Sequence, residues 1–420
     1  MTPVAADSRD GGAFDAARDG GAFDAAVVGA GPAGAAAARW LASRGRRVAL
    51  VDRSRFDAPR VGESLAPAVQ PLLTELGLWP EFRALGPLPS FGTRSHWGEA
   101  TPRVHSHMMN PWGSGWHVDR QAFDRMLVEG ARQKGAVPFL GMAVASVAET
   151  PEGWRLTLRD RGAADGESAG GGGEGADAAR GGAGSPGALT LSARILIDAT
   201  GRAARLAARL GGQRLALDHL VGVAVRFDGA DVERETYVLV EATGDGWWYS
   251  APLPGGGMIA RMMTDGDLCR RLGLVAPDAW AAHLASAPIT RTRVAGCHVV
   301  TAPRVFSAAS HRLRRPARPS PWLAVGDAAL AVDPISGSGV VRALRTARAG
   351  VNAARAVLDT GSLEAIAAYE TERDGECSRY LEERAMYYAL ERRWPDRPFW
   401  VRRDLDRTTA PPRLAAPPAA

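Results

Sequence analysis

Residues 24–52, DAAVVGAGPAGAAAARWLASRGRRVALVD, predict the fold around which the chain is organised. A short apolar strand leads into Gly29, Gly31 and Gly34, which have the G-x-G-x-x-G spacing and precede an alanine-rich helix. In a dinucleotide site the first glycine permits a tight turn and the second lets the backbone approach a pyrophosphate, while the third lets the helix pack on the strand. The helix N-terminus then offers N–H groups to the phosphates.

The end of this stretch supplies an acid at the expected distance. Residues 47–51 predict a second parallel strand, and it ends in Asp52, where a carboxylate holds a ribose hydroxyl. Strand, glycine turn, helix, strand and acid together indicate a dinucleotide site rather than a purely structural glycine turn. Because the acid disfavours a 2′-phosphate, NAD or FAD is expected before NADP.

Composition limits the remaining possibilities. The 420 residues exceed the usual size of one hydrophobic core, so two interlocked domains are expected. The net charge is only +5, and Lys134 is the single lysine among 51 basic residues, so dispersed arginines explain the charge without a nucleic-acid partner. Cys269, Cys297 and Cys377 form no C-x-x-C pair, which argues against disulfides and thiolate zinc. Without a signal peptide or an 18-residue apolar run, we expect a cytoplasmic protein and no membrane partner.

Two segments have too little apolar content to build a core. Residues 1–21, in which RDGGAFDAA first occurs before its repeat, predict a disordered extension, and residues 161–188 predict a flexible Gly- and Ala-rich insertion. Strand-like residues 154–158 and 189–197 flank the insertion, so it is expected to be a long hairpin loop.

A second, antiparallel sheet is expected from residues 91–118 and from alternating patterns between residues 221 and 264. Trp247, Trp248 and Tyr249 stand together in one of these strands. They are predicted either to line an aromatic-binding cavity or to be core and rim residues.

A second decisive stretch, WLAVGDAALAVDPISGSG, spans residues 322–339. It predicts a strand that ends at Gly326 and Asp327, and then a turn over residues 334–339 that leads into a helix over residues 340–358. An acid at a strand end can hold a ribityl hydroxyl, and a helix N-terminus favours the negative charge of a reduced flavin ring.

Together with the R-V-G-E-S segment at residues 60–64 and D-A-T-G at residues 198–201, these motifs resemble the FAD-dependent monooxygenase and halogenase superfamily over residues 24–360. The resemblance implies an α/β fold: a Rossmann-type FAD-binding domain (GR2/PHBH-like), an interleaved antiparallel-sheet substrate domain and a C-terminal helical segment. The expected FAD-binding parts are 22–90, 119–201 and 306–360, the substrate parts 91–118 and 202–305, and the C-terminal helices and tail 361–420.

The resemblance also implies the site. Arg120 is expected near the diphosphate and ribityl portion of FAD, Asp327 on the ribityl chain, and residues 334–339 beside the isoalloxazine ring. The implied FAD-binding residues are Gly29, Gly31, Pro32, Ala33, Gly34, Asp52, Arg53, Arg60, Glu63, Ser64, Arg120, Gly326, Asp327, Gly337, Gly339 and Val340. Trp247, Trp248 and Tyr249 are the predicted ring-facing residues on the substrate side, with Pro334 and Gly337 on the flavin side. No metal is expected.

The C-terminal run at residues 387–400, YYALERRWPDRPFW, resembles QhpG-like and LodB-like flavoproteins of tryptophylquinone maturation. It implies a monooxygenase that uses NADH or NADPH and O2 to hydroxylate a tryptophan in another polypeptide, such as a small Trp-containing subunit. From composition alone, this run is either a protein-binding surface or ordinary helix packing.

Three alternatives remain open. A halogenase of this superfamily requires a lysine some 20 to 30 residues after the G-E-S segment, and residues 88–92 contain none. An isoprenoid alkene reductase shares the motifs, and a non-catalytic FAD-binding assembly factor would carry a flavin that NADH does not reduce. The general base also stays open among His96, His105, His107, His117 and Glu63.

Overall fold

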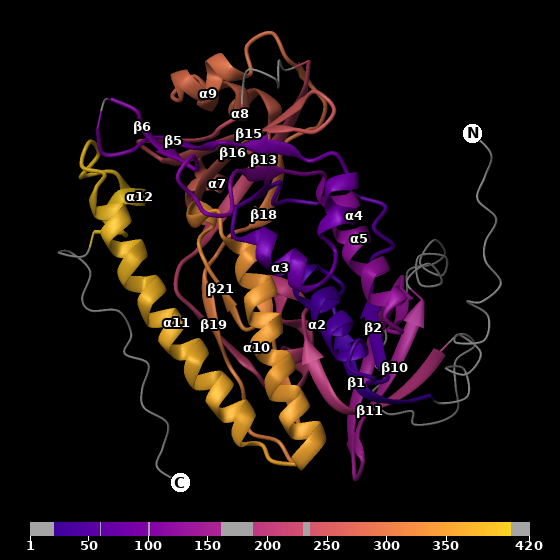
Figure 1. Cartoon of the computed structure of the whole chain (residues 1–420). Coiled ribbons are helices and arrows are strands. Elements are labelled where there is room, and N and C mark those ends of the chain that lie inside the picture. Colours follow the sequence, from indigo (N-terminus) through magenta and orange to yellow (C-terminus); the bar gives the residue numbers. More distant parts are fainter. Residues whose placement is uncertain (1–20, 59, 100, 161–187, 230–235, 405–420) are drawn as a thin grey trace, which may run out of the picture.

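Figure 1 shows the computed structural model of the chain, which describes residues 21–58, 60–99, 101–160, 188–229 and 236–404. The predicted extension, apart from residue 21, and residues 161–187 of the predicted insertion lie outside the described residues.

The first sheet is mostly parallel and carries the nucleotide-type motif. Its strand order is β8 (Val137–Leu140), β2 (Val48–Asp52), β1 (Ala22–Val28), β11 (Ala188–Asp198), β10 (Gly153–Asp160) and β9 (Met142–Thr150), with β20 (Trp322–Ala324) also paired to β11. β1 is parallel to both β2 and β11, and β11 is parallel to β20. β10 and β11 pair antiparallel, so the predicted hairpin around the insertion is confirmed.

Strand β1 is buried on both faces, which explains its continuous apolar run. Ala25 and Val27 belong to a core shared with helices on one face, whereas Ala26 and Val28 belong to the core on the other face. The helices in contact with the first face include α2 (Pro32–Ala42), α3 (Val69–Glu75), α5 (Arg120–Gln133) and α10 (Gly339–Thr360).

The second sheet lies beyond the first in the upper part of Figure 1. Its order is β17 (His298–Val299), β13 (Leu220–Asp228), β16 (Gly257–Asp265), β15 (Gly246–Leu253), β14 (Val238–Thr243), β5 (Gly92–His96) and β6 (Arg103–Ser106), with β18 (Arg304–Ser307) also on β13. The strands predicted between residues 221 and 264 are therefore confirmed. β5 pairs antiparallel with β6 but parallel with β14.

Two three-stranded sheets join these layers: β3 (Ser64–Leu65), β7 (Gly115–His117) and β4 (Leu88–Ser90), and β12 (Gln213–Ala216), β19 (His311–Arg314) and β21 (Leu330–Ala331). The prediction that residues 91–118 all belong to the second sheet is wrong for β7. Its backbone bonds to β3 and β4, and this pairing brings His117 next to Ser64.

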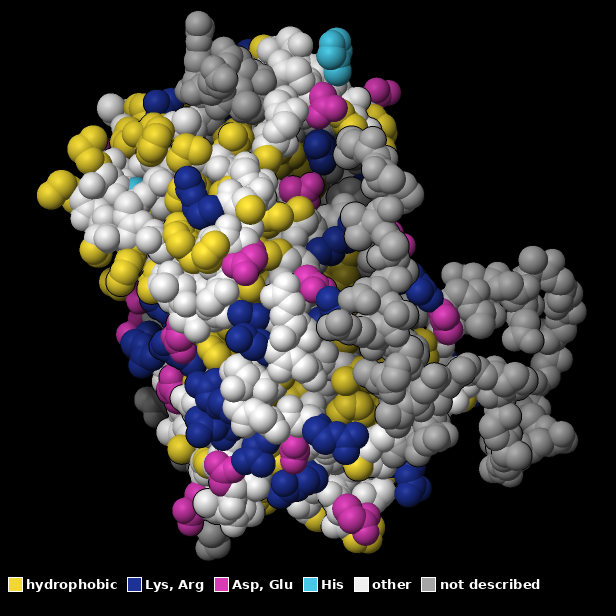
Figure 2. Space-filling model, turned by 45° about the vertical axis from the view of Figure 1, so that its right-hand side comes forward, with side chains coloured by type: hydrophobic (Ala, Val, Ile, Leu, Met, Phe, Trp, Pro, Cys, Tyr) yellow, Lys and Arg dark blue, Asp and Glu magenta, His cyan; other side chains and the backbone are white. Residues whose placement is uncertain are grey.

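The remaining helices are α4 (Trp79–Ala84), α6 (Arg205–Arg209), α7 (Gly266–Arg271), α8 (Pro277–Leu284), α9 (Pro288–Arg293), α11 (Glu364–Ala389) and α12 (Pro398–Val401). α10 and α11 lie side by side along one flank, and α11 leads toward the β5–β6 hairpin (Figure 1). Basic and acidic side chains intermix over the lower half of the face in Figure 2.

Two helical glycines give a matched test of the packing between α10 and the first sheet. A Cβ at Gly350 would lie 2.6 Å from Val325 Cγ1, whereas one at Gly375 in α11 would meet its nearest atom at 3.5 Å. Gly375→Ala should therefore stabilise the fold by about 0.5–1 kcal/mol, and Gly350→Ala should destabilise it by about 1–3 kcal/mol. Thermal unfolding of both variants measures the sign, and equal shifts would contradict this packing.

Candidate functional site

The first glycine turn has the geometry that its spacing predicts. Gly29 has φ +104°, and a Cβ there would lie 2.2 Å from the carbonyl oxygen of Ala199. A Cβ at Gly34 would lie 1.7 Å from the carbonyl oxygen of Gly29. A Cβ at Gly31 would meet nothing within 4 Å. The turn and packing roles of Gly29 and Gly34 are therefore confirmed, and space lies over Gly31 at the N-terminus of α2.

Asp52 lies at the end of β2, beside this turn. Its two carboxylate oxygens accept hydrogen bonds from the backbone N–H groups of Ala30 (2.6 Å) and Ser54 (2.7 Å). Arg53, the next predicted residue, is exposed. The acid is therefore fixed beside the glycine turn and remains partly exposed.

The second glycine turn meets the first. Gly326 has φ +60°, and a Cβ there would lie 2.8 Å from the Cβ of Ala33 in the first turn of α2. The carboxylate of Asp327 lies 3.3 Å from Nε of Arg202 and remains partly exposed. Two turns about 300 residues apart in sequence therefore converge at the N-terminus of α2.

These residues fit a dinucleotide. The first turn of α2 contains no acidic residue, its N-cap has no side-chain hydrogen bond, and the backbone at Gly31 can be approached closely. A helix N-terminus of this kind binds phosphate through its free N–H groups and its dipole. FAD would be held here with its pyrophosphate at Gly31 and Ala33, and with Asp52 and Asp327 on its hydroxyl groups.

A buried aspartate joins two arginines next to the G-E-S segment. Asp124 is fully buried, and its carboxylate binds Arg60 at 2.9 Å and Arg120 at 3.1 Å. Arg120 also donates to the carbonyl oxygens of Val61 and Gly62. Arg120 therefore fixes the loop that precedes Ser64. Sequence reasoning missed Asp124, although the i, i+4 spacing from Arg120 was visible.

A buried ion pair connects the G-E-S segment to the second sheet. The Glu63 carboxylate accepts a hydrogen bond from Arg261 of β16, and both side chains are nearly inaccessible to solvent. Burial lowers the pKa of Arg261 to about 9. The Arg261 guanidinium also lies 5.0 Å from the centroid of the Tyr249 ring. Arg261 was not predicted, because only the tertiary fold brings β16 to residue 63.

Next to this pair, three side chains form a chain of hydrogen bonds. The Tyr249 hydroxyl lies 2.6 Å from Ser64 Oγ, and Ser64 Oγ lies 3.0 Å from His117 Nδ1. His117 Nε2 lies 3.2 Å from the carbonyl oxygen of Thr236. Burial lowers the pKa of His117 to about 4, so the imidazole is neutral at neutral pH. Burial raises the pKa of Tyr249 to about 12.

The turn expected beside the flavin ring is anchored by a buried acid. Asp333 is fully buried, and its carboxylate accepts from the backbone N–H of Ile335 (3.0 Å) and from the hydroxyl of Tyr388 (2.8 Å). The Tyr388 hydroxyl in turn accepts from Nε1 of Trp247 at 3.1 Å. One hydroxyl of α11 therefore links the second sheet to this turn. Pro334 starts the turn, Gly337 ends it in the left-handed region, Gly339 begins α10 and Val340 is buried.

Comparison with known proteins agrees with this geometry. Residues 22–169 match the family described as FAD binding domain. The protein named putative FAD-dependent oxidoreductase LodB, of Marinomonas mediterranea, is 28% identical over 380 residues, which cover 90% of this chain and 95% of LodB. The chain therefore carries an FAD-binding domain and is similar over most of its length to FAD-dependent oxidoreductases of the monooxygenase and halogenase superfamily.

Solved structures of flavin-dependent enzymes share the fold of this chain. The myxobacterial chondrochloren halogenase CndH has a TM-score of 0.79 and 24% identity, over 91% of this chain and 86% of CndH. QhpG, a peptidyl tryptophan dihydroxylase essential for tryptophylquinone cofactor biogenesis, has a TM-score of 0.69 and 25% identity, over 92% of this chain and 80% of QhpG.

The structure separates the three aromatic residues predicted to face the substrate. Trp247 and Tyr249 pack with the cluster that includes Ile335 and Tyr388, whereas Trp248 packs on the opposite side of the sheet, 5.1 Å from the ring of Trp280. The prediction is wrong for Trp248, because successive side chains of a strand point to opposite faces. Trp247 is also almost fully buried, so Tyr249 is the partly exposed member.

The structure also narrows the candidates for a general base in the flavoprotein. His117 and Glu63 lie with Ser64 and Tyr249, whereas His96 and His105 lie on the β5–β6 hairpin and His107 on the loop that follows it. Within the described part of the chain, no group of three or more His, Cys, Asp or Glu residues could hold a metal ion.

Much of the C-terminal run at residues 387–400 is helix packing. Tyr388, Phe399 and Trp400 are buried in one aromatic cluster with Trp97 of the β5–β6 hairpin. Met386 and Leu390 remain exposed on the other side of this segment. Among the described helices, none combines the length and the apolar composition needed to cross a bilayer.

The first glycine turn gives a prediction that separates folding from FAD binding. Gly31→Ala should fold normally, because Gly31 has φ −69° and its Cβ meets nothing, but it should weaken FAD binding at least ~10-fold by obstructing the pyrophosphate. Gly29→Ala should instead destabilise the fold, because its Cβ meets backbone. Thermal unfolding and flavin titration of the two apoproteins measure these effects. A Gly31→Ala variant with unchanged FAD affinity would contradict this location for the pyrophosphate.

Tyr388 gives a prediction about the C-terminal helix. Tyr388→Phe leaves Trp247 Nε1 and an Asp333 oxygen buried without this partner, so we expect a loss of about 2–4 kcal/mol in the free energy of unfolding. The visible circular dichroism of bound FAD should also change, since Asp333 fixes the turn. Tyr237→Phe, in a half-buried ring stacked on Arg94, is the matched control. Unchanged stability and dichroism in Tyr388→Phe would disprove this coupling.

Proposed function

We propose that the protein is an FAD-dependent monooxygenase that uses NADH or NADPH and O2 to hydroxylate an electron-rich aromatic ring. We further propose that this ring is a tryptophan side chain in another polypeptide. The observation that carries this choice over halogenation is the position of the single lysine.

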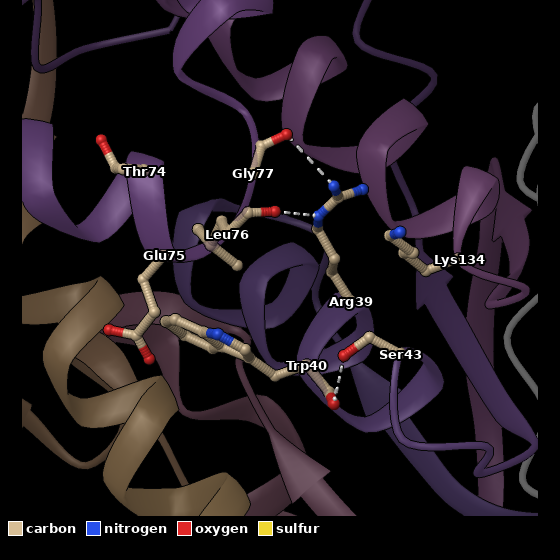
Figure 3. A pocket seen from close by; sticks show the side chains of 8 residues that line it. All are labelled: Arg39, Trp40, Ser43, Thr74, Glu75, Leu76, Gly77 and Lys134. Carbon is tan, nitrogen blue, oxygen red and sulfur yellow. Dashed lines mark hydrogen bonds between the residues drawn. The ribbon is translucent and has the colours of Figure 1, made fainter.

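Lys134 lies far from the G-E-S segment. It follows α5, whose 14 residues begin at Arg120, so about 20 Å of helix separates Lys134 from the residue that binds the Gly62 carbonyl. In Figure 3, Lys134 lies beside Arg39 and lines a pocket that includes no residue of the G-E-S segment. The others lining it are Trp40, Ser43, Thr74, Glu75, Leu76 and Gly77. A halogenase of this superfamily needs a lysine to carry hypohalous acid to the substrate, and Lys134 does not suit that role.

The side chains around Tyr249 suit the handling of an aromatic ring. When bound, FAD would supply the activated oxygen, with electrons from the nicotinamide cofactor. Buried aromatic residues next to Tyr249 exclude water. The Nε of Arg261 has no hydrogen-bond partner within the described residues, so the guanidinium retains a donor for developing negative charge.

An exposed apolar segment supports a polypeptide substrate. Five apolar side chains in the region from β4 to β7, which leads directly to His117, are 45–92% exposed. They are Phe91, Val104, Met108, Met109 and Trp112. Exposed apolar side chains gathered in one segment are typical of surfaces that bind other proteins, and methionine adapts to varied partners. The likeness to QhpG, which acts on peptidyl tryptophan, points to the same class of substrate.

Anaerobic reduction followed by isotopically labelled O2 tests the proposed function. The holoprotein is mixed with NADH or NADPH, and then with labelled O2, a Trp-containing peptide and bromide. We expect the flavin to be reduced and a labelled oxygen atom to appear on the indole ring in mass spectrometry. A matched peptide with Ala in place of Trp is the control.

The other outcomes identify the alternatives. Bromination of the indole would assign a halogenase. Flavin that is reduced without labelling the peptide, and that saturates an isoprenoid alkene when one is added in a parallel anaerobic sample, would assign a reductase. Flavin that neither nucleotide reduces, even with the peptide present, would assign a non-catalytic assembly factor.

A further inference from the structure

We propose that Tyr249, Ser64 and His117 form a proton relay that removes the proton displaced from the aromatic ring during hydroxylation. This inference rests on the proposed function. It selects His117 from the histidines that sequence analysis left open, and gives Ser64 a role beyond FAD binding.

The direction of the relay follows from its hydrogen bonds. Thr236 contributes a carbonyl oxygen, which only accepts, so His117 Nε2 must carry a hydrogen. The neutral ring then has a bare Nδ1, which accepts from Ser64 Oγ. Because the Ser64 hydroxyl hydrogen is used, Ser64 Oγ accepts from the Tyr249 hydroxyl. Both hydroxyl hydrogens of this hydrogen-bonded series therefore point in the direction from Tyr249 toward His117.

The surroundings favour a relay with one accessible end. His117 is fully buried, whereas Ser64 and Tyr249 are partly exposed. Tyr249 packs against the same cluster as Ile335 of the turn expected beside the flavin, so the partly exposed end of the relay belongs to the same part of the molecule as that turn. The oxygen of Tyr249 keeps lone pairs that can accept a proton from a substrate.

The proton displaced from the ring passes along the three side chains to His117. Ring hydroxylation with O2, two electrons from the nicotinamide cofactor and two protons forms a C–O bond with one oxygen atom, releases the other as water, and leaves an extra proton on the attacked carbon. The C–H bond breaks, its electron pair restores the aromatic ring, and the proton moves to the Tyr249 oxygen. The Tyr249 proton moves to Ser64 Oγ, and the Ser64 proton moves to His117 Nδ1. The imidazolium produced keeps its Nε2–H bond to Thr236, and after the product has left it returns the proton through Ser64 to Tyr249, the partly exposed end, which releases it to water.

A spectroscopic experiment tests the direction without turnover. In 15N-labelled holoprotein, the His117 signals are assigned by their loss in His117→Asn. We expect a protonated Nε2 and a bare Nδ1, and a shift of the Nδ1 resonance in Ser64→Ala. A protonated Nδ1 would mean that His117 donates to Ser64, which reverses the direction of the hydrogen bonds and overturns the relay.

A kinetic experiment tests the step. With FAD saturating, Ser64→Ala and Tyr249→Phe should each lower the rate of tryptophan hydroxylation about 100-fold, and this loss should exceed any change in the rate at which the nicotinamide cofactor reduces the flavin. Ser64→Thr, which keeps a hydroxyl, should restore most of the rate. Ser320→Ala removes a buried hydroxyl bonded to the Gly153 carbonyl and is the matched control.

The two proposals fail separately. If the wild-type protein hydroxylates no tryptophan, the proposed function fails and takes this step with it. If the wild type hydroxylates and Ser64→Ala is equally fast, the relay alone is wrong.

Discussion

The structure depends on the close approach of backbone segments at the N-terminus of α2. The backbone of Gly29 lies against Ala199, and Gly326 lies against Ala33. Any side chain at these glycines would separate β1, β11 and α2 by more than the packing of a folded core allows. The approach fixes where the helix N-terminus points. It also places both Asp52 and Asp327 next to the N-terminus of α2.

Side-chain contacts of the G-E-S segment connect the first sheet to the second. The G-E-S segment leaves the first sheet and meets strands β15 and β16, where Glu63 pairs with Arg261 and Ser64 bonds to Tyr249. A buried ion pair adds little net stability, but removing one partner is costly because the other charge is then left buried. The pair therefore specifies how the two sheets meet more than it strengthens the fold.

The sequence predicted what local patterns determine. Glycine spacing gave both turns, and alternation gave β13 to β16, because turn geometry and strand period are properties of a few adjacent residues. Arg261 and Tyr388 were missed as site residues since their partners lie elsewhere in the chain, whereas Asp124 was missed although one partner, Arg120, lies four residues before it. Naming Trp248 together with Trp247 and Tyr249 as ring-facing was an error, because the strand period puts Trp248 on the other face from its two neighbours.

Fold similarity cannot separate a hydroxylase from a halogenase here, because both kinds of enzyme share this architecture. The choice between hydroxylation and halogenation depends on which side chains the fold brings to the site. Halogenation in this superfamily requires a lysine to carry the oxidised halide, and the chain's single lysine stands at the far end of α5 from the G-E-S segment. Direct oxygen transfer to a ring needs an acceptor for the displaced proton instead. Around Ser64 lie a tyrosine and a neutral histidine, which our proposal uses to accept this proton, and the neighbouring cation Arg261 is paired with Glu63.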